Sequence, residues 1–204
     1  PQGDEGESRL LVLVQNHQGY LNLSEILARA WTKPLGKTQT QAQVAWAWLQ
    51  ELHAGLIVLS GAHTGLVGQA LLRGDAATAS RHALALAEMF PHRFYLELQR
   101  AGRAEDEALV AQTVELAARL QLPVVATQPI QFLRPDDFQA HEARVCIAEG
   151  EVLANAKRPR RFTQEQYFKN SLQMQELFAD IHYAVENTVE IARRCRLGRT
   201  LGKK

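Results

Sequence analysis

Apolar residues in the first two thirds of the chain gather into short runs that are separated by longer periodic stretches. Four runs consist almost entirely of aliphatic or aromatic residues and are bounded by polar or turn residues: 10–14, 56–59, 94–98 and 124–127. Unbroken apolar character, in place of alternation with polar residues, is typical of strands that are buried on both faces. The pattern therefore predicts four strands of a parallel sheet with helices on both sides.

Helical periodicity predicts two helices between these strands. One lies between Asp75 and Pro91, where apolar residues recur at steps of four, three and four and so share one face. These residues are Ala79, Ala83, Leu86 and Phe90. The other begins at the acidic residues 105–107, whose charge is favourable at the positive end of a helix dipole, and ends before Pro123. Alternating strands and helices predict an α/β protein with right-handed crossovers.

After the fourth strand the pattern changes, and three helices with no further strand are predicted. Asp136 or Asp137 is suited to cap the first of these helices. Thr163 and Gln166 have the spacing of a capping box and predict the start of the second helix. Asp180 is suited to cap the third.

This change of pattern divides the chain into two parts. Residues 1–134 form the α/β part, and residues 135–204 form a helical extension that packs on it. The strands of the first part fit two architectures, a small open sheet or one side of a barrel. Composition does not distinguish the two.

Composition and charge narrow the classes of function. Lysine and arginine number 23 against 22 acidic residues, a net charge of +1, whereas a dedicated nucleic-acid-binding domain usually has a strong basic excess. The basic clusters at 157–161 and 193–199 are candidates for contact with nucleic-acid phosphates, but we interpret them as solvated, salt-bridged helix ends. Cys146 and Cys195 lack zinc-ligand or disulfide-framework spacing. No apolar run of about 18 residues occurs, so we expect a cytoplasmic protein without a membrane partner.

Six segments carry a resemblance to a known family. They are 11–27 (LVLVQNHQGYLNLSEIL), 55–74 (GLIVLSGAHTGLVGQALLRG), 94–107 (FYLELQRAGRAEDE), 122–127 (LPVVAT), 157–167 (KRPRRFTQEQY) and 176–195 (ELFADIHYAVENTVEIARRC). In this order they resemble the amino-terminal PHP (polymerase and histidinol phosphatase) domain of bacterial replicative DNA polymerase III alpha subunits, in the proteobacterial form. The resemblance implies an α/β fold, the later half of a distorted seven-stranded (β/α) PHP barrel, followed by a helical extension towards the polymerase palm.

The resemblance also implies a degenerate metal site. Active members bind metal ions at the carboxyl ends of the barrel strands, and they usually have cysteine at the position of Ala62. After the fourth strand they have Asn-Asp-x-His, where this chain has Gln128, Pro129 and Gln131. A methyl group and neutral amides do not replace the carboxylate, imidazole and thiolate ligands that these metals favour. His63 is the one remaining candidate ligand, and the resemblance implies no metal, cofactor or catalytic residue in this chain.

Two functions from different classes follow from this resemblance. The first is a non-catalytic scaffold of a DNA-directed DNA polymerase, a nucleotidyltransferase whose own Mg²⁺ and DNA contacts lie in the rest of the alpha chain. Such a scaffold is implied to brace the polymerase core and to dock the proofreading exonuclease subunit. The alternative is a metal-dependent phosphoesterase or 3′–5′ nuclease. Ala62, Gln128, Pro129 and Gln131 favour the scaffold.

Overall fold

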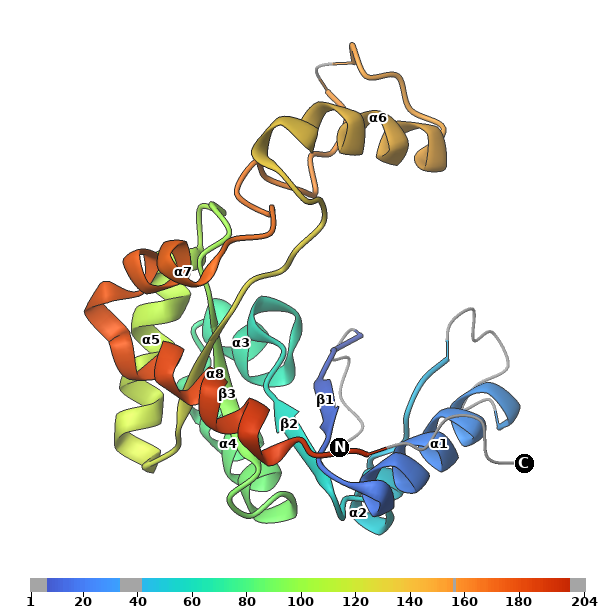
Figure 1. Cartoon of the computed structure of the whole chain (residues 1–204), viewed down its shortest axis with the longest axis vertical. Coiled ribbons are helices and arrows are strands. Elements are labelled where there is room, and N and C mark those ends of the chain that lie inside the picture. Colours follow the sequence, from blue (N-terminus) through green and yellow to red (C-terminus); the bar gives the residue numbers. More distant parts are fainter. Residues whose placement is uncertain (1–6, 34–41, 156, 199–204) are drawn as a thin grey trace.

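A four-stranded sheet forms the centre of the molecule (Figure 1). The computed structural model describes residues 7–33, 42–155 and 157–198. The strands are β1 (Leu11–Val14), β2 (Leu56–Leu59), β3 (Phe94–Gln99) and β4 (Val124–Thr127), in the sheet order β1-β2-β3-β4. All four lie where the apolar runs predict them, so the mixed α/β class is confirmed. Closure into a seven-stranded barrel stays a prediction.

The direction of β1 differs from the prediction. β2, β3 and β4 run parallel, but β1 pairs antiparallel with β2, with Leu11 opposite Leu59, so the prediction of a wholly parallel sheet was wrong. The end of β1 lies beside the start of β2, where Gln15 donates its backbone N–H to the Gly55 carbonyl at 2.9 Å. β1 is an edge strand whose residues are only partly buried. Unbroken apolar runs report burial and not strand direction, and they overstate burial at an edge.

Helices cover both faces of the sheet. α3 (Leu66–Leu72), α4 (Ala76–Met89) and α5 (Asp106–Leu120) share the larger apolar cluster with alternate strand residues. The strand residues of the opposite face form a second cluster with Ile191 of α8 (His182–Arg194). They are Ile57, Leu59, Tyr95 and Val125. α8 therefore lies across the sheet, as Figure 1 shows, and a segment of the predicted helical extension completes the core of the body.

Both helices predicted between the strands are confirmed as α4 and α5. The Asp75 carboxylate caps α4 by accepting the Thr78 backbone N–H at 2.9 Å, and α4 ends two residues before Pro91. Helices that the periodicity did not predict are α1 (His17–Thr32), α2 (Trp46–Glu51) and α3. The Asn16 side chain caps α1. Among the described residues, no helix combines the length and the apolar character that crossing a bilayer requires.

In the C-terminal part, the second helix starts later than predicted. α7 (Ser171–Leu177) is capped reciprocally by Asn170 and Gln173, each side chain accepting the other residue's backbone N–H at 2.9 Å. No helix begins at the predicted box of Thr163 and Gln166. The Gln166 side chain is instead buried, and it accepts the Thr163 N–H within a non-helical turn. Box spacing alone therefore fits a turn as well as a helix.

The first and third of these helices differ from the prediction in their caps. α6 (Phe138–Glu149) begins after Asp137, as predicted, but the Asp137 carboxylate accepts a backbone N–H of the preceding turn. Asp180 does not cap α8, whose N-cap residue is Ile181. The Asp180 carboxylate pairs with Arg100 at 2.7 Å, and this pair lowers the pKa of Asp180 below its ordinary value.

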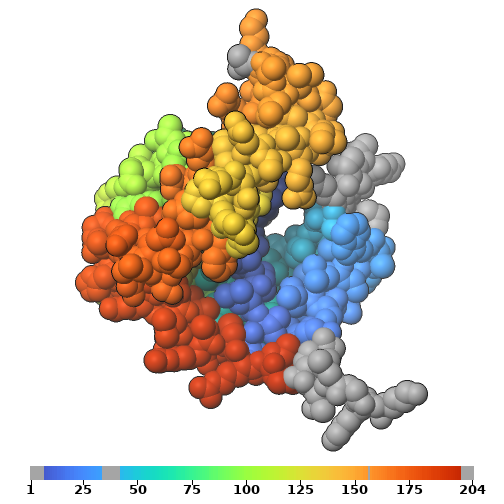
Figure 2. Space-filling view, turned by 45° about the horizontal axis from the view of Figure 1, so that its top comes forward, coloured from blue at the N-terminus to red at the C-terminus, as the bar shows by residue number. Residues whose placement is uncertain are grey.

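An excursion of the chain between β4 and α7 stands away from the body. We call residues 134–164, apart from the undescribed residue 156, the arm, and the two segments at its base, 131–133 and 165–168, the neck. Phe132 and Tyr167 form a parallel bridge across the neck. Figure 1 shows α6 running at a distance from the sheet, and Figure 2 shows the arm projecting from the body in space-filling form.

Candidate functional site

Polar residues meet at the carboxyl ends of β2, β3 and β4. This is the edge where barrels and open α/β sheets place their chemistry. The residues come from the turn after β2, from the last positions of β3 and from the end of β4. Ala62, one of the positions at which the family resemblance predicts a lost metal ligand, lies in the turn after β2 at this edge.

Glu97, on β3, is the buried carboxylate at the centre of this edge. Its Oε2 accepts the Gly61 backbone N–H at 3.0 Å. Its Oε1 accepts the Gln99 amide at 2.9 Å and also the Thr127 hydroxyl. The Glu97 backbone N–H donates to the Ser60 hydroxyl at 2.9 Å. One carboxylate thus joins the ends of three neighbouring strands, and protein donors already occupy both of its oxygens.

Ala62 and His63 lie beside this carboxylate. Together with Glu97, Gln99 and Asp106 they line a small cavity. The Ala62 side chain is buried and offers only a methyl group, as predicted from its residue type. Burial lowers the pKa of His63, and its Nδ1 has no hydrogen-bond partner. His63 is therefore an imidazole that favours the neutral form beside a carboxylate that is already satisfied.

Gly61 allows this tight approach. Its φ of 82° lies in the left-handed region, and an added Cβ would lie 2.1 Å from the carbonyl oxygen of Arg9. Any larger residue would push the turn away from the sheet. The close approach is what brings the Gly61 N–H to the Glu97 carboxylate.

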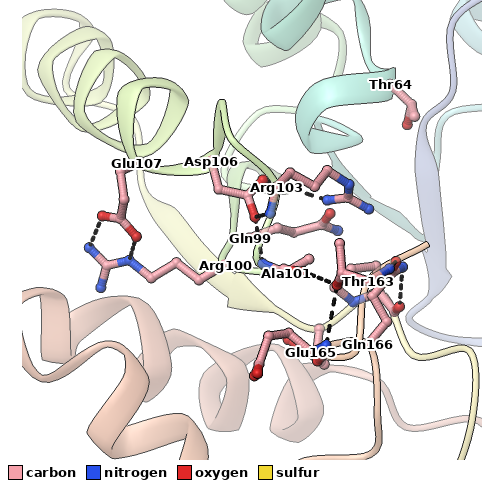
Figure 3. Close-up of polar contacts among 12 residues, drawn as sticks. Thr64, Gln99, Arg100, Ala101, Arg103, Asp106, Glu107, Thr163, Glu165 and Gln166 are labelled. Atoms are coloured by element: carbon pink, nitrogen blue, oxygen red, sulfur yellow. Dashed lines mark hydrogen bonds and ion pairs between the residues drawn. The ribbon is translucent and has the colours of Figure 1, made fainter. Parts of the chain in front are cut away.

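Asp106 organises the loop after β3 (Figure 3). Its Oδ2 accepts the backbone N–H groups of Ala101 at 2.6 Å and of Arg103 at 3.0 Å. Its Oδ1 lies 3.6 Å from the Arg103 guanidinium. Figure 3 also shows Thr163, on the returning side of the arm, against this loop, where its hydroxyl donates to the Ala101 carbonyl. The second carboxylate at the cavity is therefore also engaged by the protein itself.

The three predicted positions after β4 turn towards the neck. The Gln128 amide donates to the Glu165 carbonyl at 2.5 Å. The Pro129 carbonyl accepts the Gln166 amide at 3.0 Å, and the Gln131 backbone N–H donates to the Gln166 carbonyl at 2.8 Å. The structure thus joins Ala62 and His63 to Glu97, whereas the bonds of Gln128, Pro129 and Gln131 hold the base of the arm.

This set of donors does not fit a metal cluster. Such a cluster needs several carboxylates and imidazoles that converge with free lone pairs. Within the described ranges no three His, Cys, Asp or Glu residues are grouped so as to hold an ion. Glu97 and Asp106 bind backbone and side-chain donors instead, so the His63 imidazole lines the cavity beside two carboxylates that are already engaged.

Sequence reasoning missed Glu97 and the role of Gln166. Glu97 is the one charged residue inside an apolar run that was predicted to be a buried strand. A buried carboxylate needs donors, so its position was a signal for a polar network at that edge. The fully buried Gln166 gave no comparable signal, because its partners at Pro129 and Thr163 are set by the path of the neck.

Comparisons with known proteins agree with the resemblance. The PHP domain family model matches residues 2–101. The DNA polymerase III subunit alpha of Pseudomonas aeruginosa is 44% identical over 196 residues, which cover 96% of this chain and 16% of that protein. The subunit of Neisseria meningitidis serogroup A is 50% identical, covering 100% of the chain and 18% of the relative. The Escherichia coli K12 subunit is 43% identical, covering 98% and 17%. The chain thus spans under a fifth of the length of these relatives.

Proposed function

Because the chain belongs to the family of bacterial DNA polymerase III alpha subunits and carries part of its PHP domain, we propose that it serves DNA replication as a non-catalytic scaffold of such a subunit. In this role it braces the polymerase core and docks the proofreading exonuclease subunit in the cytoplasm. Contact with DNA and the catalytic Mg²⁺ belong to the remainder of the alpha chain. We also propose that the chain consists of an α/β part, residues 1–134, and a helical extension, residues 135–204.

The bonding of Glu97 carries this proposal. A carboxylate that served a metal would keep lone pairs directed at the ion. The Glu97 oxygens instead accept bonds from Gly61, Gln99 and Thr127, and so connect the ends of β2, β3 and β4. Hydrogen bonds to a charged acceptor contribute about 1.5–3 kcal/mol each, so this arrangement stabilises the sheet without an ion.

The positions after β4 support the same conclusion. In metal-binding members they bear ligands, whereas here Gln128, Pro129 and Gln131 hold the neck. The same edge of the sheet therefore supports a projecting element. A site that has exchanged ligands for structural bonds fits a protein whose task is architecture.

A metal-dependent hydrolase is the second candidate, and one observation favours it. The Nδ1 of His63 is buried without a partner beside a small cavity that Glu97 and Asp106 also line, which is a position that suits a ligand nitrogen. Glu97 and Asp106 oppose this candidate, because their oxygens are bound to other groups.

Two measurements on a full-length alpha subunit test the proposal. After dialysis we expect elemental analysis to find no stoichiometric Zn²⁺ or Mn²⁺, and we expect no chelator-sensitive hydrolysis of a phosphomonoester. Metal at one or more equivalents, with hydrolysis lost in His63→Ala, would establish the hydrolase instead. For the scaffold itself, Leu96→Ala, which removes a fully buried side chain of β3, should lower thermal stability and polymerase activity together.

A further inference from the structure

The distal end of the arm exposes large apolar side chains. Ile147 in the last turns of α6 is 81% exposed, and Val152 and Leu153 in the following turn are 67% and 48% exposed. The three residues lie within seven positions of one another in the sequence. Isolated exposed apolar residues are ordinary, but a group of this kind at the end of a projection marks a contact surface.

Beyond the Thr163 hydrogen bond to Ala101, the arm is ordered mainly by contacts of its own and of the neck. Both core clusters of the body lack arm residues. The His141 ring instead packs edge-on against Phe162, with 4.8 Å between centroids, and against Phe132 of the neck at 5.4 Å. Glu142 and Arg158 form an ion pair whose side chains are only 4% and 6% exposed. An excursion of about 30 residues that maintains its own small core has the length of a functional element.

The charge of the arm favours a protein surface over a nucleic acid. Residues 134–164 carry six basic and five acidic residues, a net charge of +1, and they are Arg134, Arg144, Lys157, Arg158, Arg160 and Arg161 against Asp136, Asp137, Glu142, Glu149 and Glu151. Arg158 and Arg161 are paired with Glu142 and Glu149. Nucleic-acid binding usually draws on a strong basic excess, and a net charge of +1 does not supply one.

We propose that the distal end of the arm, through Ile147, Val152 and Leu153, docks on the part of the alpha polypeptide that lies outside this sequence. This inference rests on the proposed scaffold function and names its contact surface. The relatives are single chains of which this sequence covers 16–18%, so more than four fifths of the polypeptide is available as the partner. Covalent connection gives that partner a high effective concentration, which makes a small apolar contact sufficient.

Photo-crosslinking in a full-length alpha subunit tests the inference. A photoreactive phenylalanine analogue replaces Ile147, and the control places it at Leu84, which is 50% exposed on α4 of the body. We expect position 147 to crosslink to peptides of the same polypeptide outside this sequence, at a yield well above that of position 84. Yields that do not differ, or crosslinks from position 147 only to DNA or to an added exonuclease subunit, would overturn the inference.

A pair of charge variants separates this inference from the scaffold function. Ile147→Asp with Val152→Asp should speed backbone hydrogen exchange in the arm of the full-length subunit by roughly tenfold and lower polymerase activity, whereas Leu84→Asp should do neither. If Leu96→Ala lowers activity while the arm variant matches Leu84→Asp, the scaffold stands and the docking of the arm is wrong. If none of the variants changes activity, both proposals fail.

Discussion

The body and the arm of this molecule obtain their order in different ways. The body buries apolar residues from both faces of a sheet under α3, α4 and α5 on one side and α8 on the other. The arm has a few aromatic contacts, one buried ion pair and a polar neck. Apolar burial alone is sufficient to order the large body. The small arm buries too little for that and depends on individual hydrogen bonds, ion pairs and ring contacts. Substitutions in the body and in the arm should therefore differ in how far their effects spread.

The largest effect is expected in the core of the body. Phe90 is fully buried at the end of α4, and Phe90→Ala should cost about 3–5 kcal/mol of unfolding free energy through lost burial and a cavity. Hydrogen exchange of the full-length subunit should show the loss throughout β2, β3 and β4. The surface variant Leu84→Ala serves as control, with an expected effect within about 0.5 kcal/mol. A loss confined to α4 would mean that the body does not unfold as one unit.

The second largest effect is expected in the hydrogen bonds of Glu97 at the ends of β2, β3 and β4. Glu97→Gln keeps the shape but supplies an NH₂ group where a donor is already present, so it should cost about 1–3 kcal/mol. Native-state hydrogen exchange of β2 and β3 measures this cost. Thr127→Val, which removes one donor and keeps the carboxylate, should cost less. Greater stability of Glu97→Gln would show that the carboxylate is strained by a missing ion.

Within the arm, the Glu142–Arg158 pair should act locally. Glu142→Ala leaves a guanidinium buried without its partner, so amides of α6 should exchange faster while those of β3 keep their rates. Glu142→Gln, which retains one acceptor, should be milder. Equally faster amide exchange in the arm and in the sheet would show that the two regions unfold together and do not keep their order independently.

A smaller effect is expected at the helix after the neck. Asn170→Ala removes the side chain that caps α7 and should cost about 1 kcal/mol locally. Thr163→Ala, at the capping box that the sequence predicted, should leave α7 unchanged. Its effect should fall on the loop after β3, where the Thr163 hydroxyl donates to Ala101. The pattern of hydrogen exchange in α7 distinguishes the two variants.

The smallest effect concerns pH. Burial lowers the pKa of His63 from its ordinary value of 6.5, so the unfolded chain binds a proton at this residue more readily than the folded one. Stability from this residue is therefore complete at pH above 6.5 and declines as the pH falls below it. His63→Gln should reduce the drop in melting temperature between about pH 7.5 and 5.5. An unchanged drop would mean that the burial of His63 does not set it.

The body could be predicted from the sequence to a greater extent than the arm. The four strands, α4 and α5 follow from apolar runs and helical steps, because those patterns report burial directly. The direction of β1 was missed, since it depends on where the chain returns at Gly55 and not on apolarity. The capping boxes show the same limit. The Thr163–Gln166 and Asn170–Gln173 pairs have equal spacing, and only tertiary contacts of Gln166 distinguish them.

The candidate site was predictable in residue type and not in bonding. The sequence identified Ala62, Gln128, Pro129 and Gln131 as positions that lack ligand groups. It did not reveal that three of them hold the neck, because those partners lie more than 30 residues away along the chain. The residue types at these four positions could be read from the sequence, while the bonds that they make depend on how the chain folds.

The parallel bridge between Phe132 and Tyr167 limits how the arm can change in length during evolution. A hairpin with antiparallel legs can lose one pair of residues at a time and still close. Two parallel segments need a connecting chain that runs back along their whole length. Gradual shortening of this connection would therefore break the bridge across the neck. The tip has room for added residues by contrast, since a Cβ at Gly150 would meet nothing within 4 Å, while the φ of 71° favours glycine at that one position. Insertions and deletions among homologues should therefore gather at the turn after α6 and avoid residues 131–133 and 165–168.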